Sequence, residues 1–140
     1  MNAMQNLMLL IGRLLASVLF AVSGYYKFVR YDFYVGFFEK LGVPMAHASV
    51  YAAGVFELAG ALALILGFKT RPAAVLLGLY SIAAASLAHT AFGDFNQLTH
   101  FLKNLTILGA FMAFGVVGAG AYSWDAMQAK PAAPTSDEAA

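Results

Sequence analysis

Two long windows without a charged residue constrain this chain more than any other feature. Residues 72–93 and residues 104–124 contain no Asp, Glu, Lys or Arg over 22 and 21 positions, respectively. A helix needs roughly 20 apolar residues to cross the hydrocarbon core of a bilayer. The composition agrees, because 61% of the 140 residues are hydrophobic and 11% are charged, whereas about 25% are charged in an ordinary soluble domain. We therefore expect an integral membrane protein in contact with the lipid bilayer.

Two further apolar stretches carry charges within them. Residues 6–28 contain Arg13 and Lys27, and residues 48–68 contain Glu57. Each charge at a helix centre costs on the order of 2.5–3.5 kcal/mol on insertion scales, which the surrounding Leu, Ile, Val and Phe residues can offset. The sequence thus predicts an all-α fold, an integral membrane four-helix bundle in one domain of residues 1–128, with spans at about residues 6–28, 48–68, 72–93 and 102–123.

The segments between and after these spans have distinct compositions. Residues 67–72, GFKTRP, predict a tight turn, with Gly near one helix end and Pro at the start of the next helix. Residues 29–47 place aromatic side chains at near-helical spacing, which favours an amphipathic segment along the membrane interface. Residues 129–140, AKPAAPTSDEAA, predict a disordered tail.

An even number of spans places both termini on one side of the membrane. Lys and Arg residues divide equally between the two sides, four against four, unless Lys27 and Lys103 are buried in the bundle. With those two excluded, the positive-inside rule predicts cytoplasmic termini. We also expect the first span to remain uncleaved, because no Lys or Arg precedes its apolar region and Arg13 interrupts it.

Polar and small residues gather on one face of each predicted span. On the first span that face holds Arg13, Ser17, Phe20, Gly24 and Lys27. On the second it holds Glu57 between turns of small residues, on the third Gly78, Ser81, Ala85 and His89, and on the fourth Lys103, Thr106, Ala110 and Ala113. Small residues allow close approach between membrane helices, so we expect these faces to lie inside the bundle.

The depths of these residues predict a cavity in one half of the membrane. It would hold Lys27, Glu57, His89, Lys103 and Asn104, with Gln97 and His100 at its mouth. Because ionisable groups inside membranes are usually functional, the candidate catalytic residues are Glu57, Lys27 and His89. The candidate ligand-binding residues are Arg13, Lys103, Asn104 and Gln97.

Structural roles for the same residues stay open. Glu57 could form a structural ion pair with either Lys27 or Arg13, since an unpaired carboxylate in hydrocarbon would be protonated. Lysines near helix ends could extend toward lipid headgroups, and His89 could hydrogen-bond within the bundle.

Composition and motifs argue against several classes of function. A net charge of +1 gives no field strong enough to attract nucleic acid. The chain has no cysteine, which excludes a thiol redox centre, and its three histidines lack the spacing of a metal motif, so we assign no metal. No phosphate-binding loop or nucleophile elbow is present.

Three groups of residues together resemble the DoxX family. They are Gly12-Arg13 with SGYYK at 23–27, GVFELAGALALILGFKTRPAA at 54–74, and QLTHFLKNLTILGA at 97–110. The resemblance covers nearly all of the chain except the tail and implies a small bacterial inner-membrane protein built as a four-helix bundle. The family takes its name from a subunit of a thiosulfate-oxidising, quinone-reducing membrane complex. Within the family-like motifs lie Arg13, Lys27, Glu57, Lys103 and Asn104, and His89 corresponds more weakly.

Three functional hypotheses follow. The first is a quinone-linked or redox-associated subunit, in which Lys27 with His89 or Lys103 polarises a quinone, Glu57 moves protons and a partner protein supplies electrons. The chain would not be catalytic alone, and Glu57→Gln would abolish proton transfer without preventing insertion.

The second hypothesis is a small transporter or channel for an anion or weak acid. It would require a homo-oligomer, which the pairs Gly109/Ala113 and Gly115/Ala119 could support. The third is a non-catalytic scaffold of a membrane complex, in which Lys27→Ala and Glu57→Gln would change assembly but no chemistry.

Overall fold

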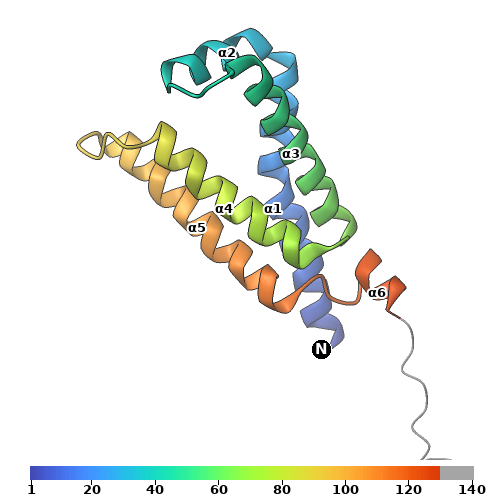
Figure 1. Cartoon of the computed structure of the whole chain (residues 1–140). Coiled ribbons are helices and arrows are strands. Elements are labelled where there is room, and N and C mark those ends of the chain that lie inside the picture. The colour runs from blue at the N-terminus through green and yellow to red at the C-terminus, as the bar shows by residue number, and fades with distance from the viewer. Residues whose placement is uncertain (130–140) are drawn as a thin grey trace, which may run out of the picture.

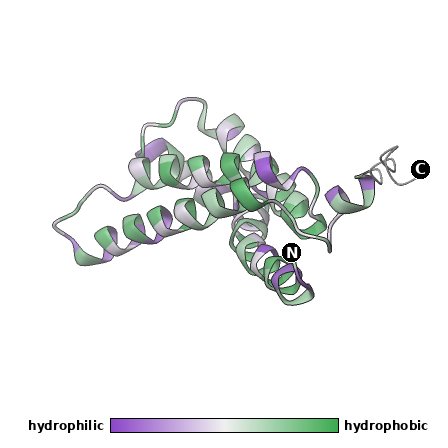
Figure 2. Cartoon of the chain, turned by 90° about the horizontal axis from the view of Figure 1, so that it is seen from below, coloured by the Kyte–Doolittle hydropathy of each residue, from purple (hydrophilic) through white to green (hydrophobic). Residues whose placement is uncertain are grey.

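The computed structural model describes residues 1–129, whose regular structure is entirely helical. The helices are α1 (Ala3–Val29), α2 (Tyr31–Lys40), α3 (Ala46–Leu66), α4 (Thr70–Ala88), α5 (Phe95–Val117) and α6 (Trp124–Gln128). Four of them, α1, α3, α4 and α5, are long and apolar enough to cross a membrane, and hydrophobic residues dominate their ribbons in Figure 2. The predicted all-α fold with four spans is confirmed. The predicted tail lies, apart from Ala129, outside the described residues.

The four long helices form two pairs that diverge from one end of the molecule. α1 packs along α3 and α4 packs along α5, whereas α3 and α4 contact each other much less, although a tight turn joins them. Figure 1 shows the pairs meeting near the N-terminus and α6, which we call the closed end, and separating toward α2, the open end. Apolar side chains from all four helices form a shared core: Phe20, Ala61, Leu64, Ala74, Leu77 and Phe111.

Two glycines allow α1 and α3 to cross closely. A Cβ added at Gly24 would lie 3.0 Å from the carbonyl oxygen of Gly54 and 2.9 Å from Leu58. A Cβ added at Gly54 would lie 2.7 Å from the ring of Phe28. All five residues of the predicted α1 face are buried, which confirms that prediction. The spacing of this face therefore determines which side of α1 meets α3.

α5 exposes the face that its small residues predicted to be buried. The residues Lys103, Thr106, Ala110 and Ala113 are all exposed, so that prediction is wrong. The α4 contact uses Leu108 and Phe111 instead, each 3.1 Å from the position of a Cβ added at Gly78. The physical reason is that a glycine on α4 accommodates bulky side chains of α5, which rotates the small residues of α5 outward.

The helix boundaries differ most from the prediction in the second half of the chain. The third span ends at Ala88 rather than near residue 93, and the fourth runs from Phe95 to Val117 rather than from about 102 to 123. Asp94 starts α5 early because its side chain accepts a hydrogen bond from the Asn96 N–H at 2.8 Å. Gly118, at φ +85°, ends α5 early. The polar residues before position 104 therefore belong to the helix rather than to a loop.

The segment between the first two spans folds as predicted for an amphipathic connection. α2 buries Val35 against Ala46 and Val50 at the start of α3, with aromatic rings packed around them. It lies across the open end of the α1 and α3 pair, as Figure 1 shows. The aromatic rings of this connection thus cover one side of the space between the two pairs.

Arg13 joins three segments at the closed end. Its guanidinium is 0% exposed and donates hydrogen bonds to the carbonyl oxygens of Leu64, at 2.9 Å, and Tyr122. The adjacent Gly67, at φ +67°, ends α3 where an added Cβ would collide with this guanidinium. Arg13 therefore ties α1 to the end of α3 and to the segment after α5, and it does not pair with Glu57.

Asp125 on α6 caps the N-terminus of α4. Its two carboxylate oxygens accept hydrogen bonds from the backbone N–H groups of Lys69, at 2.7 Å, and Thr70, at 3.0 Å. A carboxylate at a helix N-terminus also complements the helix dipole. α6 is thereby fixed against the turn between α3 and α4.

Burial changes the charge count on which the predicted orientation depends. Lys27 is buried as assumed, but Lys103 is exposed and Arg13 is fully buried. When Arg13 is also excluded and Lys103 is counted, three basic residues remain on each side (Lys69, Arg71 and Lys130 against Arg30, Lys40 and Lys103). The cytoplasmic placement of the termini therefore stays a prediction.

The glycine crossing predicts a sharp difference between two alanine substitutions. Gly24→Ala should destabilise the fold by roughly 1–3 kcal/mol, because the new methyl group meets backbone across the contact. Gly36→Ala on α2 is the matched control, since nothing lies within 4 Å of its added Cβ and Ala favours a helix. Thermal unfolding in detergent would compare the two, and equal midpoints would contradict the close crossing.

Removal of the Arg13 guanidinium should loosen the closed end. We expect Arg13→Met to lower the free energy of unfolding by roughly 2–4 kcal/mol, because two buried carbonyl groups lose their donor. Arg30→Met removes an exposed guanidinium and should change stability by less than about 1 kcal/mol. Reversible unfolding in bicelles would measure both, and a neutral Arg13→Met would show that the closed end is held by other contacts.

Candidate functional site

A buried ion pair lies where α1 crosses α3. The Lys27 ammonium is 2.9 Å from Oε1 and 2.8 Å from Oε2 of Glu57, and the two residues are 5% and 3% exposed. The crossing at Gly24 and Gly54, one turn before each partner, brings the two side chains together. Of the two partners that the sequence left open for Glu57, the structure selects Lys27.

Three neighbouring side chains complete the polar contacts of this pair. Lys27 also donates to the Ser23 hydroxyl at 2.9 Å, and the Tyr80 hydroxyl donates to Glu57 Oε1 at 2.8 Å. The Lys27 ammonium lies 5.1 Å from the ring centre of Tyr34 on α2. Burial, together with the nearby Glu57 carboxylate, raises the pKa of Tyr34, so its phenol stays protonated. Five helical positions thus form one connected group, which we call the Glu57 network.

A second polar contact faces this network from α4 and α5. The Ser81 hydroxyl donates to the side-chain oxygen of Asn104 at 2.6 Å. The side-chain nitrogen of Asn104 donates in turn to the His100 carbonyl at 2.9 Å. Asn104 is therefore oriented by contacts on both sides of its amide.

Two histidines lie at the open end. The imidazoles of His89 and His100 stack with ring centres 4.9 Å apart and an interplanar angle of 17°. His89 Nδ1 lies 2.8 Å from Gln97 Oε1, within hydrogen-bond distance. His89 follows the last residue of α4, so its ring is placed at the rim rather than in the hydrocarbon centre.

A cavity of about 590 Å³ connects these groups between the two helix pairs. It is lined by Lys27 and Glu57 on one wall, by Ser81 and Asn104 on the other, and by His89 at its rim. Most of the remaining lining is aromatic or aliphatic: Leu19, Phe20, Tyr34, Phe37, Phe38, Leu41, Val43, Phe56 and the alanines of α3 and α4. The cavity is thus a mainly apolar cleft with a few polar groups on facing walls, the usual composition of a small-molecule site.

The structure gathers most of the predicted site residues but separates two of them. Lys27, Glu57, His89 and Asn104 line the cavity, and Gln97 contacts it through His89. Lys103 is exposed on α5 and does not line the cavity, which corrects its predicted place, because Asn104 takes the inward position one residue later. Arg13 lies at the closed end, away from this cavity.

Tyr80, like Ser23 and Tyr34, belongs to the Glu57 network but was not predicted as a site residue from the sequence. A tyrosine in a charge-free membrane span is itself a signal, because a buried phenol needs a hydrogen-bond partner. Tyr80 finds it in Glu57. Within residues 1–129, no three His, Asp or Glu side chains are grouped closely enough to hold a metal ion.

The ion pair makes the polar wall electrically neutral. The one positive charge of Lys27 faces the one negative charge of Glu57, and both carboxylate oxygens accept hydrogen bonds. A neutral ligand that can accept or exchange hydrogen bonds fits such a wall better than an anion does, because an anion would have to displace Glu57.

The family model described as DoxX matches residues 8–90. The chain belongs to the DoxX family. The match includes the Glu57 network, whereas Asn104 lies beyond it. This DoxX-family protein is 34% identical over 129 residues to inner membrane protein YphA of Escherichia coli (strain K12), covering 89% of this chain and 92% of the relative. It is 32% identical over 125 residues to inner membrane protein YqjF of the same organism, covering 89% of this chain and 95% of the relative.

No solved structure matches this DoxX-family protein. Its relatives and its four apolar spans establish a multi-pass protein of the bacterial inner membrane.

The buried pair predicts a strong coupling between its two partners. Lys27→Met and Glu57→Leu should each lower stability by roughly 3–5 kcal/mol, because either change leaves an unpaired group in a low-dielectric interior. The double variant should regain most of that loss. Unfolding free energies in bicelles would complete the cycle. Losses that simply add in the double variant would rule out a coupled pair.

Proposed function

We propose that this protein is a quinone-linked subunit of an inner-membrane redox complex. The observation that carries the proposal is the apolar cavity with Lys27 and Glu57 on one wall and Asn104 on the facing wall. A quinone is neutral and soluble in lipid, and it carries two carbonyl oxygens on opposite edges of its ring. The second N–H of Asn104 suits one of those oxygens, Lys27 or Tyr80 would redirect a hydrogen bond from Glu57 to the other, and the aromatic lining suits the ring.

The side chains of the Glu57 network suit proton exchange with a quinone that is being reduced. Two-electron reduction to the quinol consumes two protons, and negative charge develops on the oxygens before those protons arrive. Lys27 and Tyr80 donate to Glu57 in this structure and would redirect a hydrogen bond to stabilise this charge once Glu57 has taken up or returned a proton. His89 at the rim would exchange protons with water at the membrane surface.

The two electrons would come from a reduced partner protein in the same complex. Thiosulfate chemistry is not carried over from the family name, since function resides in sites rather than in folds. The neutral polar wall is the reason to prefer a quinone over the anion or weak-acid substrate of a transporter. A non-catalytic scaffold would need neither the cavity nor the donors on its walls.

Quinone content would test this proposal. We expect protein isolated with its native lipids in polymer discs to retain quinone above the level of the surrounding membrane. Tyr80→Phe and Asn104→Leu should each reduce the quinone content several-fold, because each removes a hydrogen-bonding side-chain group from the lining of the cavity. Tyr25→Phe, which alters an exposed tyrosine on α1, is the matched control. Mass spectrometry of an organic extract would measure the quinone.

The outcomes separate the three hypotheses. Quinone at the bulk membrane level in every sample would contradict the proposal. Anion flux into liposomes that contain this protein alone would favour the transporter. Loss of partner subunits in Glu57→Gln, with no quinone in the unaltered protein, would favour the scaffold.

A further inference from the structure

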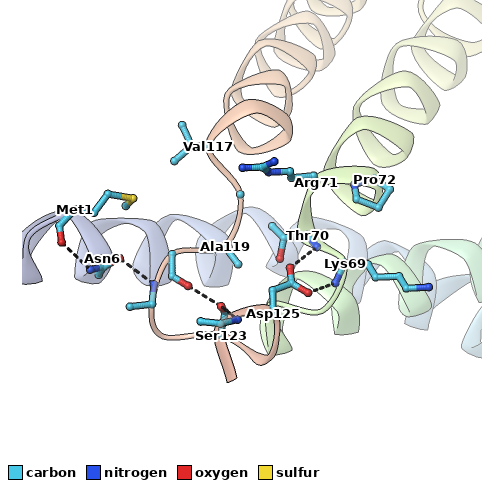
Figure 3. Close-up of a pocket in the computed structure, with 14 residues that line it drawn as sticks. Met1, Asn6, Lys69, Thr70, Arg71, Pro72, Val117, Ala119, Ser123 and Asp125 are labelled. Atoms are coloured by element: carbon cyan, nitrogen blue, oxygen red, sulfur yellow. Dashed lines mark hydrogen bonds between the residues drawn. The ribbon is translucent and has the colours of Figure 1, made fainter. Parts of the chain in front are cut away.

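A second cavity lies at the closed end, remote from the Glu57 network. It has a volume of about 600 Å³ and lies among the start of α1, the turn between α3 and α4, and the segment that joins α5 to α6. Figure 3 shows the Arg71 side chain extending toward Val117 above Thr70, the Lys69 side chain extending to the other side, and Asp125 below Thr70. Because four spanning helices begin or end here, this cavity is at the level of a membrane surface.

One polar group that lines this cavity has no partner. The Thr70 hydroxyl is buried, and within residues 1–129 it makes no hydrogen bond. An unsatisfied buried hydroxyl costs about 1–3 kcal/mol, and in a native structure it points to a missing water, ion or ligand. The hydroxyl is thus a buried donor at the edge of the cavity, without an acceptor among residues 1–129.

Two cations accompany that hydroxyl without a counterion of their own. Lys69 and Arg71 form no ion pair within residues 1–129. The Arg71 side chain extends from α4 to the end of α5, where its Nε lies 3.1 Å from the position of a Cβ added at Gly118. Its side chain therefore lies against the end of α5 beside the cavity, and the residue as a whole is exposed.

Asp125 is the carboxylate that lines this cavity within residues 1–129, and it forms no ion pair with Lys69 or Arg71. Both oxygens of Asp125 accept hydrogen bonds from the first turn of α4, and this carboxylate also lies near the buried Arg13. The N-terminus of α4 is consequently already capped and supplies no anion site. The charges of Lys69 and Arg71 leave the cavity with a positive balance.

We propose that this cavity binds a phosphate ester, namely the headgroup of an anionic phospholipid. Arg71 would bind two phosphate oxygens through its planar fork, and the Thr70 hydroxyl would donate to a third. Lys69 would add a point charge at the surface, where anionic lipids attract basic residues. The site is separate from the proposed quinone cavity and does not depend on it.

Lipid retention tests the cationic part of this site. We would reconstitute the full chain in discs of phosphatidylcholine with phosphatidylglycerol and count the lipids retained by native mass spectrometry. Arg71→Gln should reduce phosphatidylglycerol retention about tenfold or more, since a charged hydrogen-bonding group is lost. Lys40→Gln removes an exposed charge from α2, at the opposite end, and should retain the lipid as the unaltered protein does. Equal retention by the two variants would overturn the proposal.

The Thr70→Val variant tests separately whether the Thr70 hydroxyl contacts the lipid, because a hydroxyl with only a structural role would not change the stabilisation by added lipid. In lipid-free detergent this isosteric change should leave the melting temperature unchanged or raise it, because it removes an unpartnered hydroxyl. Added phosphatidylglycerol should then stabilise the unaltered protein more than Thr70→Val. A lower melting temperature without lipid, or equal stabilisation by lipid, would contradict a ligand at this hydroxyl. Inorganic phosphate that stabilises as well as the lipid would overturn the lipid assignment in favour of free phosphate.

Discussion

A charge placed within the hydrocarbon of a membrane has to be neutralised locally, and this requirement organises the open half of the molecule. Lys27 and Glu57 meet that requirement for each other, which is possible because α1 and α3 cross at two glycines one turn away. Tyr80 then reaches Glu57 from α4. The pair therefore fixes both the register of α1 on α3 and the polar end of the cavity.

In the closed half, charged side chains hydrogen-bond to backbone groups rather than to one another. Arg13 donates hydrogen bonds to carbonyl groups at the end of α3 and after α5. Asp125 accepts hydrogen bonds from the N–H groups at the start of α4. Helix ends leave such groups without partners, and lipid offers none. The fold thus uses one cation and one anion as caps where the four spans converge, and it leaves the other end free to separate.

The spacing of polar residues along the sequence correctly predicted the buried face of α1. The α1 face from Arg13 to Lys27 could be read from spacing alone, since residues three and four apart lie on one side of a helix. The family motifs likewise indicated the spans and the membrane. Four of the cavity residues, including Glu57 and Asn104, also followed from the sequence as neighbours.

The rotation of α5 and the contact of Tyr80 could not be predicted in this way. Small residues at Thr106, Ala110 and Ala113 suggested a packed face, but the glycine that admits α5 lies on α4, and a single sequence does not say which helix supplies the space. Tyr80 depends on the angle between the helix pairs, a tertiary quantity that local patterns do not encode. Charge-free windows also misplace helix ends, as at Phe95, because a helix can extend well beyond a flanking charge such as Lys103.

The turn between α3 and α4 is a short connection from which the two helix pairs diverge. Gly67 and Lys69 both adopt positive φ, at +67° and +44°, so the chain reverses within a few residues and the pivot is short. α4 has 19 residues, which corresponds to an arm of about 28 Å. A change of about 10° in the angle at the pivot would displace the far end of that arm by about 5 Å, and Tyr80, midway along, by about half as much. A displacement of that size at Tyr80 would break its 2.8 Å hydrogen bond to Glu57, so this single bond ties the width of the entrance to the ion pair.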